Sequence, residues 1–224
     1  MKTCGLISLI LCWSLLGWGG SSSAILQRGA SVYINYCVGC HALHYLTYQR
    51  MAYDLNLIDK NKKIDKNLLY GNLIFSESLL NHTIETSLSS QDALNWFGRV
   101  PPDLSLITRQ KPTRWLKQYL RGFYRDSKRP FGVNNHMLFN TNMPNIFMRL
   151  PDTRYQIKAF DQAQKQHTNQ MIEDLVAFLV YVGDPFYTKR HYLGYWVMGW
   201  LTGMWILALG LMRSYWPKSL QKHV

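Results

Sequence analysis

Cys37, Cys40 and His41 form the pattern C-x-x-C-H, the feature that most constrains what this chain can fold into. The pattern is the attachment site of a covalent c-type haem, because two thiols at this spacing reach the two vinyl groups of one porphyrin. The histidine after the second thiol then lies under the iron as its proximal ligand. A thioredoxin-like dithiol or half of a zinc site also uses C-x-x-C, but the adjoining histidine and the lack of a second C-x-x-C disfavour both. The pattern therefore predicts a chain that folds around one haem.

The first 24 residues have the parts of a secretory signal peptide. Lys2 gives a positive start, residues 6–16 are apolar, and Ser22-Ser23-Ala24 fits a small-residue cleavage site. A short N-terminal membrane anchor is the alternative interpretation. Cys4 and Cys12 both lie in this segment, so we expect its removal to leave the two cysteines of the haem motif and no structural disulfide.

A second apolar run covers residues 192–212, without a single charged side chain. At a rise of about 1.5 Å per residue, a helix of this length crosses a hydrocarbon core of about 30 Å. Aromatic residues crowd both ends of the run, as they do at membrane interfaces. Glycines recur along it, so either a partner helix packs closely against the run or it is a lone lipid-facing anchor. We expect an anchor helix over residues 191–213 and a haem domain over residues 25–190.

The two ends of the chain agree on its orientation. A cleaved signal peptide places the following domain outside the cytoplasm, and the tail over residues 214–224 carries lysines and no acid, as cytoplasmic ends do.

The whole chain has 25 Lys and Arg against 13 Asp and Glu, a net charge of +12. A nucleic-acid role does not suit an exported and anchored chain. The charge therefore favours an acidic redox partner or anionic lipid, unless the few acidic residues cluster around the haem edge.

The exported domain is expected to be all-α with long loops. Apolar residues at three- and four-residue steps predict helices at residues 27–43, 65–80, 113–124 and 169–182. Gly183-Asp184-Pro185 ends the last of these helices, and a linker over residues 185–191 leads into the apolar run. The sequence shows no strand-rich region and no internal repeat.

The sixth coordination position of the iron separates electron carriers from ligand-binding or catalytic haem proteins. Met143 is the leading candidate, because it precedes Pro144 in a turn-rich segment that can carry a thioether over the haem. Met137 and Met148 lie in the same region and are rivals, since a methionine more often packs than ligates.

Several motifs follow one another along the chain: Cys37 to His41, Asn95-Trp96-Phe97-Gly98, Pro101-Pro102-Asp103-Leu104-Ser105, Tyr119 to Tyr124, Asn142-Met143-Pro144 and Asp174-Leu175-Val176. With the C-terminal apolar run, this order resembles the cytochrome c1 family, the haem subunit of the cytochrome bc1 (ubiquinol–cytochrome c oxidoreductase) complex, in its proteobacterial form. C-x-x-C-H alone is generic. Its combination with P-P-D-L-S, the late Met-Pro and the anchor is far more discriminating.

The resemblance implies a class I c-type cytochrome-like domain with one covalent haem c and its iron, on one C-terminal transmembrane helix. It implies that the thiols hold the haem, that a histidine and a methionine ligate the iron, and that a proline lines the pocket. Two basic residues would lie near a haem propionate, although arginine is usual at the second position and lysine stands here. The implied residues are Cys37, Cys40, His41, Met143, Pro102, Arg109 and Lys111, with His41 and Met143 as the iron ligands.

The function that the resemblance implies is electron relay, with no self-contained catalytic site. An electron would arrive from the Rieske iron–sulfur protein, which takes it from quinol at the cytochrome b subunit, and leave for a c-type cytochrome. The haem domain would lie in the periplasm and the anchor in the lipid of the bacterial inner membrane. Two alternatives outside the bc1 complex remain: a peroxidase-like haem enzyme with an open sixth site, and a tethered electron shuttle or terminal-oxidase haem subunit.

Overall fold

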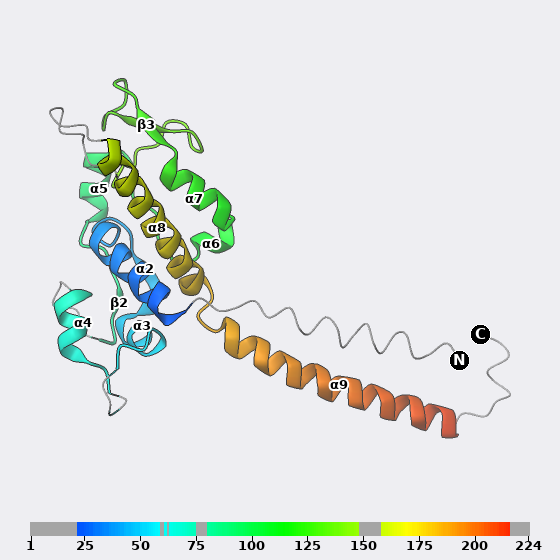
Figure 1. The fold of residues 1–224 in the computed structure, drawn as a ribbon. Helices are drawn as coiled ribbons and strands as arrows, with labels where there is room; N and C mark the ends of the chain where they lie inside the picture. Colours follow the sequence, from blue (N-terminus) through cyan, green and yellow to red (C-terminus); the bar gives the residue numbers. More distant parts are fainter. Residues whose placement is uncertain (1–21, 59–60, 62, 75–79, 148–157, 216–224) are drawn as a thin grey trace. The chain divides into compact units, whose positions relative to one another are not determined.

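The computed structural model describes residues 22–58, 61, 63–74, 80–147 and 158–215. The chain divides into two compact units, residues 1–183 and 184–224. The boundary lies close to the predicted end of the haem domain. The first unit contains, in chain order, α2 (Ser23–Tyr36), β1 (Leu43–Thr47), α3 (Tyr48–Asp54), α4 (Lys66–Asn72), β2 (Thr83–Ile84), α5 (Ser90–Phe97), α6 (Ile107–Gln110), α7 (Thr113–Arg121), β3 (Phe123–Arg125), β4 (Val133–Asn135) and α8 (Lys158–Gly183). The described part of this unit is mostly helical, as predicted (Figure 1).

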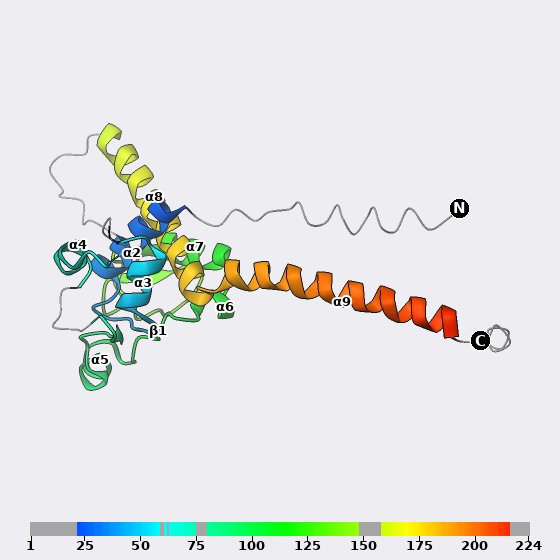
Figure 2. The same cartoon turned by 90° about the horizontal axis from the view of Figure 1, so that it is seen from below.

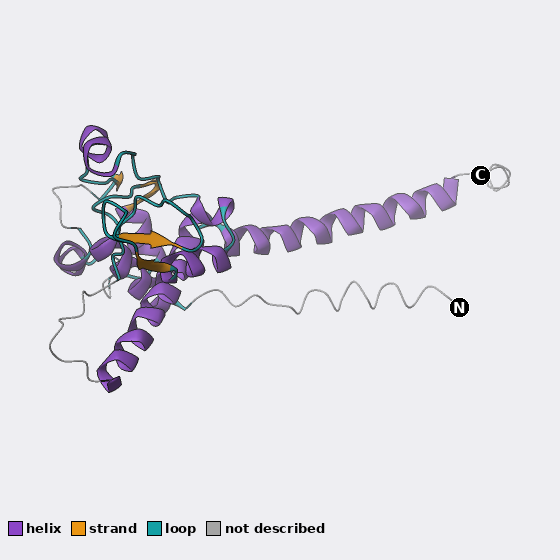
Figure 3. Ribbon diagram, turned by 90° about the horizontal axis from the view of Figure 1, so that it is seen from above, coloured by secondary structure: helices purple, strands orange, loops and turns teal. Residues whose placement is uncertain are grey.

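Two small antiparallel sheets interrupt the helices, and the sequence did not predict either of them (Figure 3). In one sheet β1 pairs with β2, with Leu43 opposite Ile84. In the other, β3 and β4 form a hairpin in which Phe123 pairs with Asn135 and Arg125 with Val133. The domain is therefore helical with short strands rather than purely α-helical.

Helix α8 is the central element of the first unit, and α2, α6 and α7 all contact it (Figures 1 and 2). The contact with α2 is close because Gly29 has no side chain. A β-carbon built at Gly29 would lie 2.1 Å from the carbonyl oxygen of Asp174 and 2.7 Å from Cβ of Phe178. Beside this crossing, the Arg28 guanidinium makes two hydrogen bonds to the Asp174 carboxylate, at 2.7 and 3.1 Å. That carboxylate is nearly buried, so the paired arginine removes the cost of an isolated buried charge.

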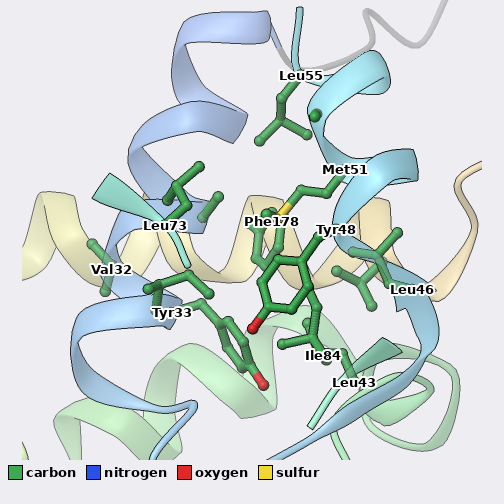
Figure 4. Close-up of a cluster of buried hydrophobic side chains, with 14 of the residues drawn as sticks. Val32, Tyr33, Leu43, Leu46, Tyr48, Met51, Leu55, Leu73, Ile84 and Phe178 are labelled. Carbon is green, nitrogen blue, oxygen red and sulfur yellow. The ribbon is translucent and has the colours of Figure 1, made fainter. Parts of the chain in front are cut away.

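The main hydrophobic core lies between α2, α3, the first sheet and α8 (Figure 4). Tyr33 of α2 and Phe178 of α8 are fully buried, with ring centroids 5.8 Å apart. Met51 of α3 and Ile84 of β2 are also fully buried and point into the same cluster. This core fixes the C-terminal end of α2, from which the C-x-x-C-H segment continues.

Helix periodicity predicted the existence of the helices better than their ends. The helix expected over residues 169–182 is confirmed as the C-terminal half of α8. The helix expected over 113–124 ends at Arg121, where β3 follows after Gly122. The helix expected over 27–43 ends at Tyr36, because residues 37–40 form a turn and β1 begins at Leu43. Of the stretch 65–80, the structure shows α4, and residues 75–79 lie outside the described residues.

The second unit contains helix α9, Tyr187–Tyr215. Its residues Lys189–Tyr215 are long and apolar enough to cross a membrane, which agrees with the predicted anchor in length and composition. The expected linker over 185–191 is wrong for its second half, since α9 begins at Tyr187. No described atom lies within 4 Å of a β-carbon built at any of the four glycines of the run. Of the predicted signal peptide, residues 1–21 lie outside the described residues and the predicted cleavage point falls at the start of α2.

Candidate functional site

A large pocket opens in the first unit, lined by the turn after α2, the P-P-D-L-S loop, α7, the loop after β4 and α8. It holds about 1290 Å³ of space, counting the part that opens to solvent. Most of its lining side chains are aliphatic or aromatic, and few charged groups reach it.

Both cysteines of the motif line this pocket. The end of α2 continues into a tight turn, in which the amides of Cys40 and His41 donate to the Cys37 carbonyl at 3.0 and 2.9 Å. Burial raises the pKa of the Cys37 thiol to about 12 and also raises the pKa of Cys40. A redox-active dithiol requires a lowered thiol pKa, so this environment disfavours that alternative for the C-x-x-C pair. A hydrophobic pocket that presents two neutral thiols suits covalent attachment of an apolar ring.

His41 lines the same pocket and is held in one tautomer. Its Nδ1 lies 2.7 Å from the carbonyl oxygen of Pro102. A carbonyl only accepts, so Nδ1 carries the proton and Nε2 keeps its lone pair for a metal. Burial lowers the pKa of His41, against the opposing effects of the Pro102 hydrogen bond and the Asp103 charge, which also favours a neutral ring. The backbone of His41 is fixed as well, because the Tyr33 hydroxyl donates to its carbonyl at 2.5 Å.

The P-P-D-L-S segment lies against the motif, although about sixty residues separate them in sequence. Besides the Pro102 contact to His41, the amide of Leu104 donates to the carbonyl of Ala42 at 3.0 Å. The Asp103 carboxylate accepts from the amide of His44 at 2.9 Å. Pro102 lines the pocket, so the segment both orients the histidine and forms part of the wall.

Met143 lines the pocket that contains the two thiols and His41. Its sulfur lies 3.6 Å from the Tyr119 hydroxyl, which donates to it. Burial raises the pKa of Tyr119, so the hydroxyl keeps its proton. Of its two rivals, Met137 is described and does not line the pocket, and Met148 lies outside the described residues.

Arg109 and Lys111, expected near a propionate, do not line the pocket. The exposed Arg109 side chain donates through Nε to the carbonyl of Gly183 at 3.2 Å, where it caps the C-terminal end of α8. The ammonium of Lys111 lies 5.1 Å from the ring centroid of Trp115, a cation–π distance. Arg99 does line the pocket, and sequence reasoning missed it. Arg99 lies between the N-W-F-G and P-P-D-L-S motifs, and this position was the feature of the sequence that could have identified it as a pocket residue.

The donor atoms gathered here fit a c-type haem. Two neutral thiols, an imidazole with a free Nε2 and a thioether all face one apolar pocket. This is the set that attaches a porphyrin covalently and closes both axial positions of its iron. Among the residues that the structure describes, no group of three or more His, Cys, Asp and Glu side chains could hold a metal ion by itself.

Comparison with known proteins agrees with this site. The model of the Cytochrome C1 family matches residues 13–219 of the chain. Cytochrome c1 of Allochromatium vinosum is 36% identical over 211 residues, which cover 86% of this chain and 84% of that protein. The ammonia monooxygenase gamma subunit of Nitrosomonas europaea is 31% identical over 199 residues, 85% of this chain and 82% of that one. The mitochondrial cytochrome c1 haem protein of Neurospora crassa is 22% identical over 85% of this chain and 61% of its own.

The order of the motifs, the pocket that unites them and these matches over almost the whole chain lead to one assignment. The chain belongs to the cytochrome c1 family, in its proteobacterial form, and haem c is its cofactor.

Proposed function

We propose that this chain carries one electron at a time through a closed haem c, from a Rieske iron–sulfur protein to a c-type cytochrome, within a bc1 complex. One observation supports this most strongly: the two thiols, the free Nε2 of His41 and the sulfur of Met143 face the same apolar pocket. In this proposal Cys37 and Cys40 form the two thioethers, and His41 and Met143 occupy the axial positions.

Bound haem c supplies an iron centre that alternates between the ferrous and ferric states. The residues of the chain determine how it does so. A neutral histidine and a thioether donate no negative charge, and apolar walls disfavour the extra charge of the ferric state, so both features raise the reduction potential. With His41 and Met143 both engaged, no position is left for peroxide or another ligand. The proposal therefore assigns electron relay rather than peroxidase-like chemistry.

The proposed topology follows from the two apolar ends of the chain. Residues 1–24 would act as a cleaved signal peptide, and α9 would cross the inner membrane once, with the haem domain over 25–190 in the periplasm and the tail over 214–224 in the cytoplasm. Interfacial tyrosine and tryptophan residues at the two ends of the run support this placement. Cytochrome b is the proposed partner of the helix within the bilayer.

The charge of the chain bears on the acceptor. Over residues 25–191 the chain has 21 Lys and Arg against 13 Asp and Glu, a balance of +8, so opposite charge on the acceptor would speed encounter and salt would slow it. The proposed acceptor is therefore an acidic c-type cytochrome. Raising the ionic strength from about 10 to about 200 mM is expected to slow reduction of an acidic acceptor several-fold, as stopped-flow mixing would show.

Purification of the intact chain from detergent-solubilised membranes tests the assignment to a complex. We expect a C-terminally tagged chain to bring cytochrome b and a Rieske protein with it. Replacing residues 192–212 with a leucine–alanine helix of equal length should reduce this recovery several-fold and leave the haem spectrum unchanged, because the haem site lies wholly in the first unit. A second variant replaces only the glycines of the run with alanine, and a similar loss of recovery would show that the partner helix approaches through them.

Two outcomes of that purification would contradict the proposal. A chain that transfers electrons at full rate alone would be a tethered shuttle. A relative carries the name ammonia monooxygenase gamma subunit, so recovery with monooxygenase subunits instead of cytochrome b would assign the chain to a different assembly.

A further inference from the structure

The segment that carries Met143 is a loop, yet contacts from α5, α7 and the β3–β4 hairpin hold it. Asn140 has a left-handed backbone, with φ of 61°, a conformation that asparagine adopts more readily than most other residues with a side chain. Its amide donates to Oδ1 of the buried Asn134 at 3.0 Å. Two residues on, the Asn142 side chain donates to the carbonyl of Phe97 at 2.7 Å, which ties the loop to the end of α5.

Arg129 makes the largest set of contacts to this loop. It lies in the turn that joins β3 and β4. Its guanidinium donates to the Asn140 side chain at 3.3 Å, to the carbonyls of Asn140 and Thr141 at 2.9 and 3.1 Å, and to Oδ1 of Asn142 at 2.6 Å. One planar cation thus holds three consecutive residues: Nη2 contacts all three of them, and Nη1 makes a second contact to the Asn140 side chain. All three residues immediately precede Met143.

The thioether itself takes part in a small ring of hydrogen bonds. The amide of Met143 donates to Oγ1 of Thr141 at 3.4 Å, and the Thr141 and Tyr119 hydroxyl oxygens lie 2.8 Å apart. The Tyr119 hydroxyl then donates to the sulfur of Met143. Each group has one proton to give, so the three bonds form together when Thr141 donates to Tyr119. A thioether has two lone pairs, so sulfur accepts this bond through one pair and keeps the other for a metal.

The tyrosine ring is held independently of its hydroxyl. It stacks on Trp115 with ring centroids 5.2 Å apart and meets the edge of Phe123 at 5.4 Å. Replacing Tyr119 with a non-aromatic residue would therefore disturb packing, whereas replacing it with phenylalanine removes only the oxygen and leaves both ring contacts. This separation allows the hydroxyl to be tested by itself.

We infer that Arg129 and Tyr119 are positioning residues for the sixth ligand: Arg129 fixes the loop over residues 140–142, and the Tyr119 hydroxyl orients the Met143 thioether and withdraws electron density from it. The inference rests on the proposed role of Met143 and extends it to two residues that do not touch the iron. Withdrawal of density from sulfur favours the ferrous state, so the hydroxyl raises the reduction potential.

Tyr119→Phe tests the hydroxyl in the full-length membrane protein. We expect a lower reduction potential than that of the parent, measured by redox titration of the visible spectrum, with the ring contacts and the melting temperature kept. Tyr45→Phe is the matched control, because Tyr45 is 72% exposed and loses the same oxygen. A potential equal to that of the parent and of the control would overturn the role of the hydroxyl.

Arg129→Gln tests the loop. We expect it to weaken the far-red charge-transfer band of the ferric methionine–iron bond, and to let at least tenfold more of the ferrous haem bind carbon monoxide. Arg129→Lys keeps the charge and one donor nitrogen but loses the Nη1 contact, so we expect a smaller effect than that of glutamine. Arg125→Gln removes an exposed arginine from the same hairpin and should change neither readout.

The outcomes separate the inference from the function on which it rests. If Met143→Ala alters the band and carbon monoxide binding while both Arg129 variants leave them at parental values, Met143 is the ligand and Arg129 does not position it. If Met143→Ala itself changes nothing, the proposed ligand is wrong.

Discussion

Met143→Ala is expected to convert a haem that does not bind carbon monoxide into one that does. The variant removes the only sulfur ligand proposed for the iron and leaves an apolar space where the thioether faces the pocket. Loss of an axial methionine also removes its stabilisation of the ferrous state. Axial ligands set haem potentials over about 0.8 V, so we expect a fall on the order of 0.1–0.3 V. Difference spectra with carbon monoxide and a redox titration give the two values.

Met137→Ala is the matched control for this variant. Met137 lies six residues earlier in the same part of the chain and does not line the pocket. We expect its replacement to leave carbon monoxide binding and the potential at parental values. If Met137→Ala opened the haem and Met143→Ala did not, the assignment of the sixth ligand would have to be reversed.

Gly29→Ala is expected to cause the largest loss of stability from a single methyl group. The new β-carbon would lie 2.1 Å from a backbone oxygen of α8, and a backbone atom cannot turn aside as a flexible side chain can. Helices α2 and α8 must then separate, at a cost near the top of the range for overpacking, about 3 kcal/mol in the free energy of unfolding. Because α2 leads directly into the C-x-x-C-H turn, the yield of haem-loaded protein should fall as well.

Thermal or denaturant unfolding of the haem-loaded variant measures this loss. Gly71→Ala provides the control, since nothing lies within 4 Å of a β-carbon there and Gly71 is in α4. Alanine favours a helix over glycine, so the control should be neutral or more stable by up to about 1 kcal/mol. Equal stability of the two variants would show that the close crossing of α2 and α8 contributes little.

The sequence predicted most accurately those features that depend on local periodicity. Ile172, Val176 and Leu179 recur at three- and four-residue steps, and all are buried in α8. The apolar face expected for residues 113–124 does line the pocket through Trp115 and Tyr119. Each of these predictions needs only that a helix place such residues on one side.

The first sheet was not predicted from the sequence, because its two strands, β1 and β2, are far apart in the chain and stabilise each other only by pairing. Leu43 and Leu46 are the buried residues of β1, and their spacing of three is one that a helix shows as well. The irregular register with β2 destroys the simple alternation by which strands are recognised. Residues 83–84 come to lie beside β1 only in the folded chain.

Motifs and resemblance named Cys37, Cys40, His41 and Met143 from the sequence, and all four line one pocket. A charged side chain belongs to no such motif, and its position depends on the fold of a loop. Arg109 therefore proved to cap α8, while Arg99, which no motif contains, lines the pocket. The hydrogen bond from His41 to Pro102 also required the fold.

The visible spectrum of the ascorbate-reduced, membrane-extracted protein, recorded before and after carbon monoxide, decides whether the haem is a closed electron relay. We expect a sharp c-type spectrum that carbon monoxide leaves unchanged, because His41 and Met143 would occupy both remaining ligand positions of the iron. A parental haem that binds carbon monoxide readily would contradict the closed relay and favour a ligand-binding or peroxidase-like function.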